Sequence, residues 1–197
     1  MAPESPSLSA ELIRAVELLC EAFDRKSTSY AIIGGLATLM RGRPRFTQDV
    51  DVLIDVRQLA LPDLLETLAQ SGFTFDMTTA MREYTREHMT VLRFGMVRVD
   101  WLKPILPLYA RALADASTLI WSEGHPVRVA TAEGVILTKL VAFRPQDQVD
   151  IEVLLSANRD QIDLDCIRRE WSAVSRGEEA RTAWLEGAIA RLVQTPG

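Results

Sequence analysis

The chain has 197 residues, of which 48% are hydrophobic and 25% charged, and its formal net charge is −5. Such a chain can bury a sizeable core as one domain, or as a domain with a small appendage, which excludes a disordered protein. The acidic balance argues against broad electrostatic binding to nucleic acid, although it is compatible with a small local patch of cations.

Three further features concern the compartment and the cysteines. No stretch reaches the apolar length of a membrane span, and residues 1–7 lack the basic and apolar parts of a signal peptide, so we expect a cytoplasmic protein without a membrane partner. Cys20 and Cys166 lie far apart and have no histidine at ligand spacing, which predicts two core thiols. His88 and His125 share no ligand spacing either, and His125 fits a turn.

Strands and helices alternate through the first two thirds of the chain. Helical patterns predict helices over residues 9–25, 36–40 and 61–70. Apolar or alternating runs predict strands over residues 30–33, 47–55, 90–94, 97–102 and 126–129. This order predicts an α/β (α+β) protein with a mixed sheet flanked by helices.

The last third of the chain has a purely helical pattern. We expect helices over residues 132–143, 146–155, 164–174 and 178–193. The chain therefore divides into a predicted core of residues 1–130 and a C-terminal helical region of residues 131–197.

Two carboxylates stand one residue apart inside an apolar strand. Side chains at i and i+2 of a strand share a face, so Asp49 and Asp51 project together while Val50 and Val52 pack on the other side. Such a pair repels itself unless a cation compensates it, and Mg²⁺ is a hard cation that takes carboxylate oxygens. A solvated edge strand is the alternative interpretation.

Two other segments strengthen the metal hypothesis. The strand at residues 30–33 ends in Gly34 and Gly35 before a helix, where backbone amides can approach a phosphate closely, although the same glycines fit a simple tight turn. The strand at residues 97–102 carries a third acid, Asp100, with Trp101 on its opposite face.

In this order and spacing, Ile33-Gly34-Gly35, Asp49-Val50-Asp51 and Asp100 resemble the minimal nucleotidyltransferase superfamily, whose members are distant relatives of DNA polymerase beta. The run at residues 45–52 is most similar to the subgroup that includes the toxin halves of AbiE-type abortive-infection toxin–antitoxin systems. A second motif of that subgroup is matched by Lys139-Leu140, Arg144, Asp147 and Asp150. Two positions depart from the pattern: Gly35 replaces a frequent serine, and Gln146 replaces a frequent basic residue.

The resemblance implies an enzyme with a nucleotidyltransferase-type sheet that moves a nucleoside monophosphate from a nucleoside triphosphate to a hydroxyl group. Asp49, Asp51 and Asp100 would be both the catalytic residues and the ligands of Mg²⁺ or Mn²⁺. The acceptor would be an RNA or tRNA end or a protein, with a cognate antitoxin as a possible partner. An antibiotic-modifying nucleotidyltransferase and a non-catalytic nucleotide-binding module of the same fold are the alternatives.

Five residues are predicted to bind the nucleotide: Gly34, Gly35, Arg45, Thr47 and Lys139. Arg45 belongs to an arginine-rich loop whose guanidinium groups suit phosphate oxygens, although Arg41 and Arg43 fit a solvated loop equally well. Thr47 fits either a hydrogen bond to a phosphate or carboxylate, or an ordinary strand position.

Lys139 stands among apolar helical residues, where an ammonium can serve the phosphates or extend to water along its aliphatic stem. Its neighbours in the second motif, Arg144, Asp147 and Asp150, fit an ion-pair network as well as they fit substrate contact.

Overall fold

The computed structural model describes residues 8–43 and 47–193, apart from the side chain of Glu123. The helices are α1 (Ala10–Arg25), α2 (Gly34–Arg41), α3 (Leu61–Gln70), α4 (Met77–Arg86), α5 (Pro107–Ala114), α6 (Ala132–Ala142), α7 (Pro145–Ala157), α8 (Leu164–Ser172) and α9 (Glu179–Leu192). The strands are β1 (Ser29–Ile33), β2 (Asp49–Asp55), β3 (Met89–Phe94), β4 (Val97–Leu102), β5 (Ser117–Ile120) and β6 (Pro126–Val129), with a 3-10 turn, η1 (Ser122–Gly124), before β6.

The strands form one mixed sheet in the order β3-β4-β2-β1-β6-β5. Strand β2 lies antiparallel to β1 and parallel to β4, and β6 lies parallel to β1. The edge strands β3 and β5 each pair with their neighbours in an antiparallel manner. The predicted fold class, a mixed sheet flanked by helices, is confirmed.

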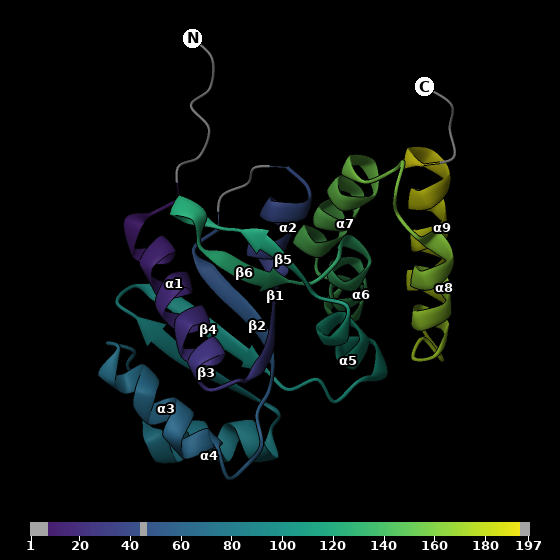
Figure 1. Cartoon of the computed structure of the whole chain (residues 1–197). Helices are drawn as coiled ribbons and strands as arrows, with labels where there is room; N and C mark the ends of the chain where they lie inside the picture. Colours follow the sequence, from purple (N-terminus) through teal and green to yellow (C-terminus); the bar gives the residue numbers. More distant parts are fainter. Residues whose placement is uncertain (1–7, 44–46, 194–197) are drawn as a thin grey trace.

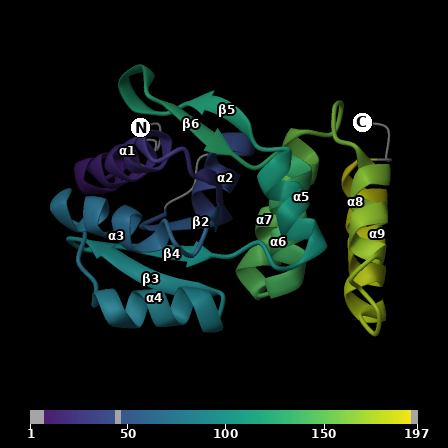
Figure 2. The same cartoon turned by 60° about the horizontal axis from the view of Figure 1, so that its bottom comes forward.

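Helices cover both faces of this sheet. On one face, Phe23 of α1 packs its ring against Tyr30 and Trp101, with centroids 4.9 and 5.6 Å apart, and Tyr84 of α4 meets Trp101 edge-on. Helices α2, α5 and α6 pack on the other side, α7 lies beside α6, and α8 and α9 stand outermost (Figures 1 and 2). Trp101 therefore points away from the face that carries Asp100, as predicted.

Three elements escaped prediction, and each has a local reason. Helix α4 carries three threonines in ten residues, which weakens its helical pattern although Asp76 caps it. Helix α5 begins at Pro107, which is favourable only in the first turn. Edge strand β5 is largely exposed and so lacks a buried alternating face.

The predicted C-terminal helices are all present, with bounds within a few residues of the expected ones. Helix α6 is almost entirely buried because it packs against α2, α5, α7 and α8. The division of the chain at residue 130 therefore stays a prediction, since α6 is in contact with the helices that precede it. No helix in the described parts of the chain has the length and apolar character to cross a membrane.

Candidate functional site

The sheet topology brings the three predicted acids together. Because β2 and β4 are parallel neighbours, Asp51 lies directly beside Asp100, and Asp49 lies beside Arg98. Val50 and Val52 are fully buried on the opposite face. Asp49 and Asp51 therefore share a face, as the strand periodicity predicts, and that face is the one covered by α5 and α6.

The glycine turn adjoins this face at the end of β1. Helix α2 begins at Gly34 itself, two residues earlier than predicted, with Ile33 of β1 paired to Asp51. Gly34 has a φ of +62°, and a Cβ atom there would overlap the Asp51 carboxylate. The backbone N–H of Gly35 donates to that carboxylate. Gly34 is thus required for the close approach of Asp51 to the start of α2.

Lys139 of α6 enters the same site but does not extend to water. Its side chain is only 6% exposed, and its Nζ donates to Asp150 Oδ2 at 2.6 Å and to Asp147 Oδ1 at 3.3 Å. Arg144 holds Asp147 through both its backbone N–H and its Nε, and Gln146 donates to Asp150. The ion-pair network considered from the sequence is therefore present, and it includes Lys139.

The pKa values of Asp51 on the sheet and Asp147 on the helical side are shifted in opposite directions. Burial, followed by the charge of neighbouring Asp100, raises the pKa of Asp51 above its ordinary value, while Lys139 opposes the shift. Burial would also raise the pKa of Asp147, but hydrogen bonds from Arg144 and the charge of Lys139 outweigh it and hold that pKa below its usual range. Asp51 therefore lacks the compensation that Asp147 has.

A cavity of about 380 Å³ unites these groups. Its lining includes all the predicted site residues that the structure describes, namely Gly34, Gly35, Thr47, Asp49, Asp51, Asp100 and Lys139. The remaining predicted residue, Arg45, lies outside the described residues. A larger cavity of about 600 Å³, around Ser29 at the other end of β1, contains none of these residues.

Sequence reasoning missed one wall of the cavity. Leu102, Tyr109, Thr138 and Ala142 also line it. Leu102 could have been found, because it follows Asp100 by two residues on the same strand. Tyr109 could not, since it belongs to α5, a helix that was not predicted.

The metal prediction stays a prediction. Carboxylate oxygens are the donors that Mg²⁺ and Mn²⁺ prefer, so the three acids fit these ions chemically. Within residues 8–43 and 47–193, however, no three His, Cys, Asp or Glu side chains form a group that could hold a metal ion. Asp100 is instead paired with Arg98, whose Nε lies 2.8 and 3.0 Å from its two carboxylate oxygens.

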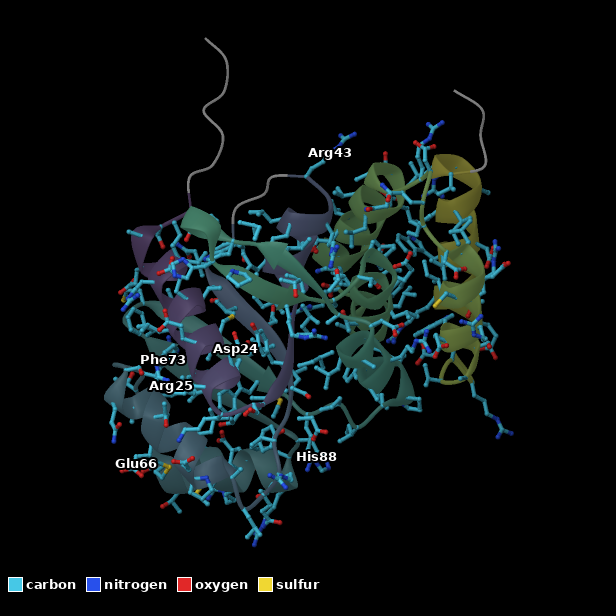
Figure 3. All side chains as sticks on the ribbon, viewed as in Figure 1. Asp24, Arg25, Arg43, Glu66, Phe73 and His88 are labelled. Carbon is cyan, nitrogen blue, oxygen red and sulfur yellow. The ribbon has the colours of Figure 1, made fainter. Side chains whose placement is uncertain are left out.

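Other polar residues near the site have local roles. Arg41 is the last residue of α2 rather than part of a solvated loop, and its guanidinium donates to the carbonyls of Val129 and Ala130 and to Ser117, which ties α2 to the strands β5 and β6. Arg43 is exposed and projects away from the protein (Figure 3). Thr47 donates to the carbonyl of Asp49.

The cysteines and histidines stand apart from this chemistry. Cys20 is buried as predicted, whereas Cys166 is only half-buried, so the prediction of a core thiol is wrong for Cys166. His125 contacts the carbonyl of Ser122 beside η1, in keeping with the turn predicted for it.

Comparisons with known proteins identify the fold. No family model and no curated protein matches the chain. Among solved structures, the antibiotic-resistance factor ANT(2″)-Ia aligns over 93% of this chain and 100% of its own, with a TM-score of 0.52 and 18% identity. The chain has a nucleotidyltransferase-type fold.

Two further structures align at similar length. An antigenic nucleotidyltransferase-like protein from Paracoccidioides brasiliensis covers 95% of this chain and 99% of its own, with a TM-score of 0.49 and 19% identity. A structure of ANT(2″)-Ia in complex with adenylyl-2″-tobramycin covers 91% and 97%, with a TM-score of 0.44 and 14% identity. At such identities the likeness concerns the nucleotidyltransferase-type fold alone, and function must be argued from the site.

Proposed function

We propose that this protein is a metal-dependent nucleotidyltransferase that moves a nucleoside monophosphate from a nucleoside triphosphate to a hydroxyl group and releases pyrophosphate. The observation that carries the proposal is the convergence of Asp49, Asp51 and Asp100 with the Gly34-Gly35 turn in one cavity. These residues come from two strands and a helix start, and adjacent like charges on one face of a sheet are unfavourable without a compensating cation.

Each residue has a task in this proposal. Asp49, Asp51 and Asp100 would hold Mg²⁺ or Mn²⁺, and the bound ion would supply neutralisation of the phosphate charge and activation of the attacking hydroxyl. The N–H groups at the start of α2 and the ammonium of Lys139 would orient the triphosphate. Asp100, which joins from a separate strand, would face the acceptor and take its proton.

The charges around the cavity bear on the acceptor. Apart from the three strand acids, the described lining has the carboxylates of Asp147 and Asp150, and both are already paired with cations. A polycationic antibiotic would find few free carboxylates here, whereas Arg144, whose side chain is 75% exposed, would favour an anionic acceptor. An RNA or tRNA end is therefore the acceptor we favour, ahead of a protein hydroxyl.

The role as a toxin, with a cognate antitoxin, is part of the same proposal and rests on the resemblance of residues 45–52 and 139–150 to AbiE-type toxins. A small antitoxin-like gene beside this one would support it. Antibiotic modification, the reaction implied by the product bound to ANT(2″)-Ia, is the second candidate, because that protein shares the fold.

The deciding experiment is label transfer. Wild-type protein, Mg²⁺ and each labelled nucleoside triphosphate are incubated with total RNA or with cell lysate, and the labelled product is identified. We expect label on RNA, none with Asp49→Asn/Asp51→Asn, and normal transfer with Asp55→Asn, an exposed acid at the far end of β2. Tight nucleotide binding without transfer to any acceptor would favour a binding module instead.

A further inference from the structure

Four charged side chains form a compact group on one face of β2 and β4. Asp49 lies beside Arg98 and Asp51 beside Asp100, so that three acids and one arginine occupy adjacent positions of two parallel strands. Neighbouring strands are about 4.8 Å apart, and like charges at directly adjacent positions destabilise a sheet. Arg98 is the cation that this group contains on its own strands.

Arg98 engages one of the three acids and leaves the others. Its Nε contacts both oxygens of Asp100, at 2.8 and 3.0 Å, and no ion pair joins Arg98 to Asp49 or Asp51. The carboxylate that would complete the metal site is thus held by a guanidinium. Among the residues that the structure describes, no three-acid group that could hold a metal is present alongside this pairing.

Arg98 can leave this position without disrupting the core. Its side chain is 42% exposed, whereas that of Asp100 is 18% exposed, and Asp100 is its one side-chain partner among the described residues. It does not line the cavity itself. Turning Arg98 outward would therefore free both oxygens of Asp100 and leave the cavity wall unchanged.

We propose that Arg98 is a positioning residue that acts as the counter-ion of Asp100 until a divalent cation replaces it. Binding of the divalent ion to the Asp100 carboxylate is then coupled to release of the Arg98 guanidinium from the same carboxylate. The contact lowers the affinity for free metal and stabilises the metal-free sheet. This inference rests on the metal site of the proposed function, but it assigns a role that the three acids do not have.

The first test measures metal binding alone. Mn²⁺ is titrated into nucleotide-free protein, and the unbound ion is followed by electron paramagnetic resonance. We expect Arg98→Gln to bind Mn²⁺ about tenfold more tightly than the wild type, a difference of ~1.4 kcal/mol. Arg93→Gln is the matched control, because Arg93 pairs directly with Arg98 on β3 and loses the same charge without touching Asp100.

The second test measures stability with and without metal. In a chelator, Arg98→Gln leaves Asp100 beside Asp51 without a cation, and we expect its melting temperature to lie roughly 2–4 °C below that of the wild type. Saturating Mg²⁺ should remove most of this gap. A merely structural arginine would give the same gap in both conditions, and Arg98→Lys should fall between the wild type and Arg98→Gln.

The outcomes separate this inference from the proposed function. If the wild type binds Mn²⁺ and Asp49→Asn/Asp51→Asn does not, the metal site stands; equal Mn²⁺ affinities of Arg98→Gln, Arg93→Gln and the wild type would then overturn the role of Arg98 alone. If neither the wild type nor Arg98→Gln binds Mn²⁺ without nucleotide, the exchange is overturned, and label transfer alone decides the proposed function. Binding by Arg98→Gln with none by the wild type would support the exchange in its strongest form.

Discussion

The acids on the two sides of the cavity are compensated to different degrees. On the helical side, Asp147 and Asp150 are almost fully buried and share the charge of Lys139, with Arg144 as a further partner. On the sheet side, Asp49, Asp51 and Asp100 share one face, and the one ion pair that these acids make among the described residues is that of Asp100 with Arg98. The negative charges of the helical acids are balanced by cations within the folded protein. Those of the sheet acids would be fully balanced only by a bound ligand.

The largest effect is expected when the acids on the sheet side of the cavity are removed. Asp49→Asn/Asp51→Asn should abolish Mg²⁺-dependent nucleotide binding, while the fold in a chelator stays as stable as the wild type or becomes more stable, because two adjacent charges are removed. Calorimetric titration of Mg²⁺–nucleotide measures the first effect and urea unfolding the second. Unchanged nucleotide affinity would contradict the metal hypothesis.

Asp100 tests whether the sheet side performs chemistry. Asp100→Asn preserves size but removes a charge needed to hold a cation and to accept a proton, so we expect transfer to slow by at least ~10²-fold. Nucleotide affinity in Mg²⁺ should change far less. Label transfer and nucleotide binding are measured side by side, and a variant that transfers at the wild-type rate would reduce Asp100 to a structural residue.

Lys139 tests the helical side, where stability and binding must be separated. Lys139→Met leaves Asp147 and Asp150 buried with less compensation, which we expect to cost ~3 kcal/mol of unfolding free energy. If the ammonium also serves the triphosphate, affinity should fall about tenfold.

Two further variants separate these effects. Lys139→Met/Asp150→Asn should regain stability but not affinity, while Lys103→Met, which loses only a cation above the ring of Tyr84, is the matched control. Affinity that returns together with stability would make Lys139 a purely structural residue.

A smaller effect is the dependence of the unfolding free energy on pH, which has opposite signs for Asp51 on the sheet side and Asp147 on the helical side. The raised pKa of Asp51 favours its neutral form in the folded state, so its contribution to stability is present below the ordinary Asp value near 4 and is lost as pH rises through the raised pKa. Asp147, whose pKa is lowered, has the opposite effect. Its contribution to stability is present above the ordinary Asp value and is lost as the pH falls through the lowered pKa.

Urea unfolding in a chelator can resolve these signs. At pH 7, Asp51→Asn should be more stable than the wild type and Asp147→Asn less stable, and the advantage of Asp51→Asn should shrink as the pH is lowered toward 4. An Asp51→Asn variant that is less stable than the wild type at pH 7 without metal would contradict the sign assigned to Asp51.

The sequence predicted the site best at positions where a residue of unusual chemistry also stands in a regular strand pattern. Asp49 and Asp51 interrupt an apolar strand, so the sequence indicated both their shared face and their unusual charge, although β2 begins at Asp49, two residues later than predicted. The pairing of Lys139 with Asp150 was only one of two interpretations, because a helical pattern does not fix how α6 and α7 pack. Arg98 was overlooked because an arginine on a strand face ordinarily meets water.

Some features depend on contacts that no local pattern encodes. Whether β2 runs parallel to β4 depends on the chain between them, including α4, whose polar sequence concealed it. The role of Arg41 likewise depends on the carbonyls of Val129 and Ala130, which lie far along the chain. The adjacency of Asp51 and Asp100 therefore required the structure.

The parallel pairing of β2 with β4 also has a consequence for synthesis on the ribosome. Asp49 and Asp51 emerge early and can pair with β1, but Asp100 reaches them only after α3, α4 and β3 have been made and β4 has entered the sheet. Lys139 emerges later still. A nascent chain that ends before β4 therefore lacks the acid that lies beside Asp51, and the proposed transfer reaction would require synthesis to have passed both β4 and α6.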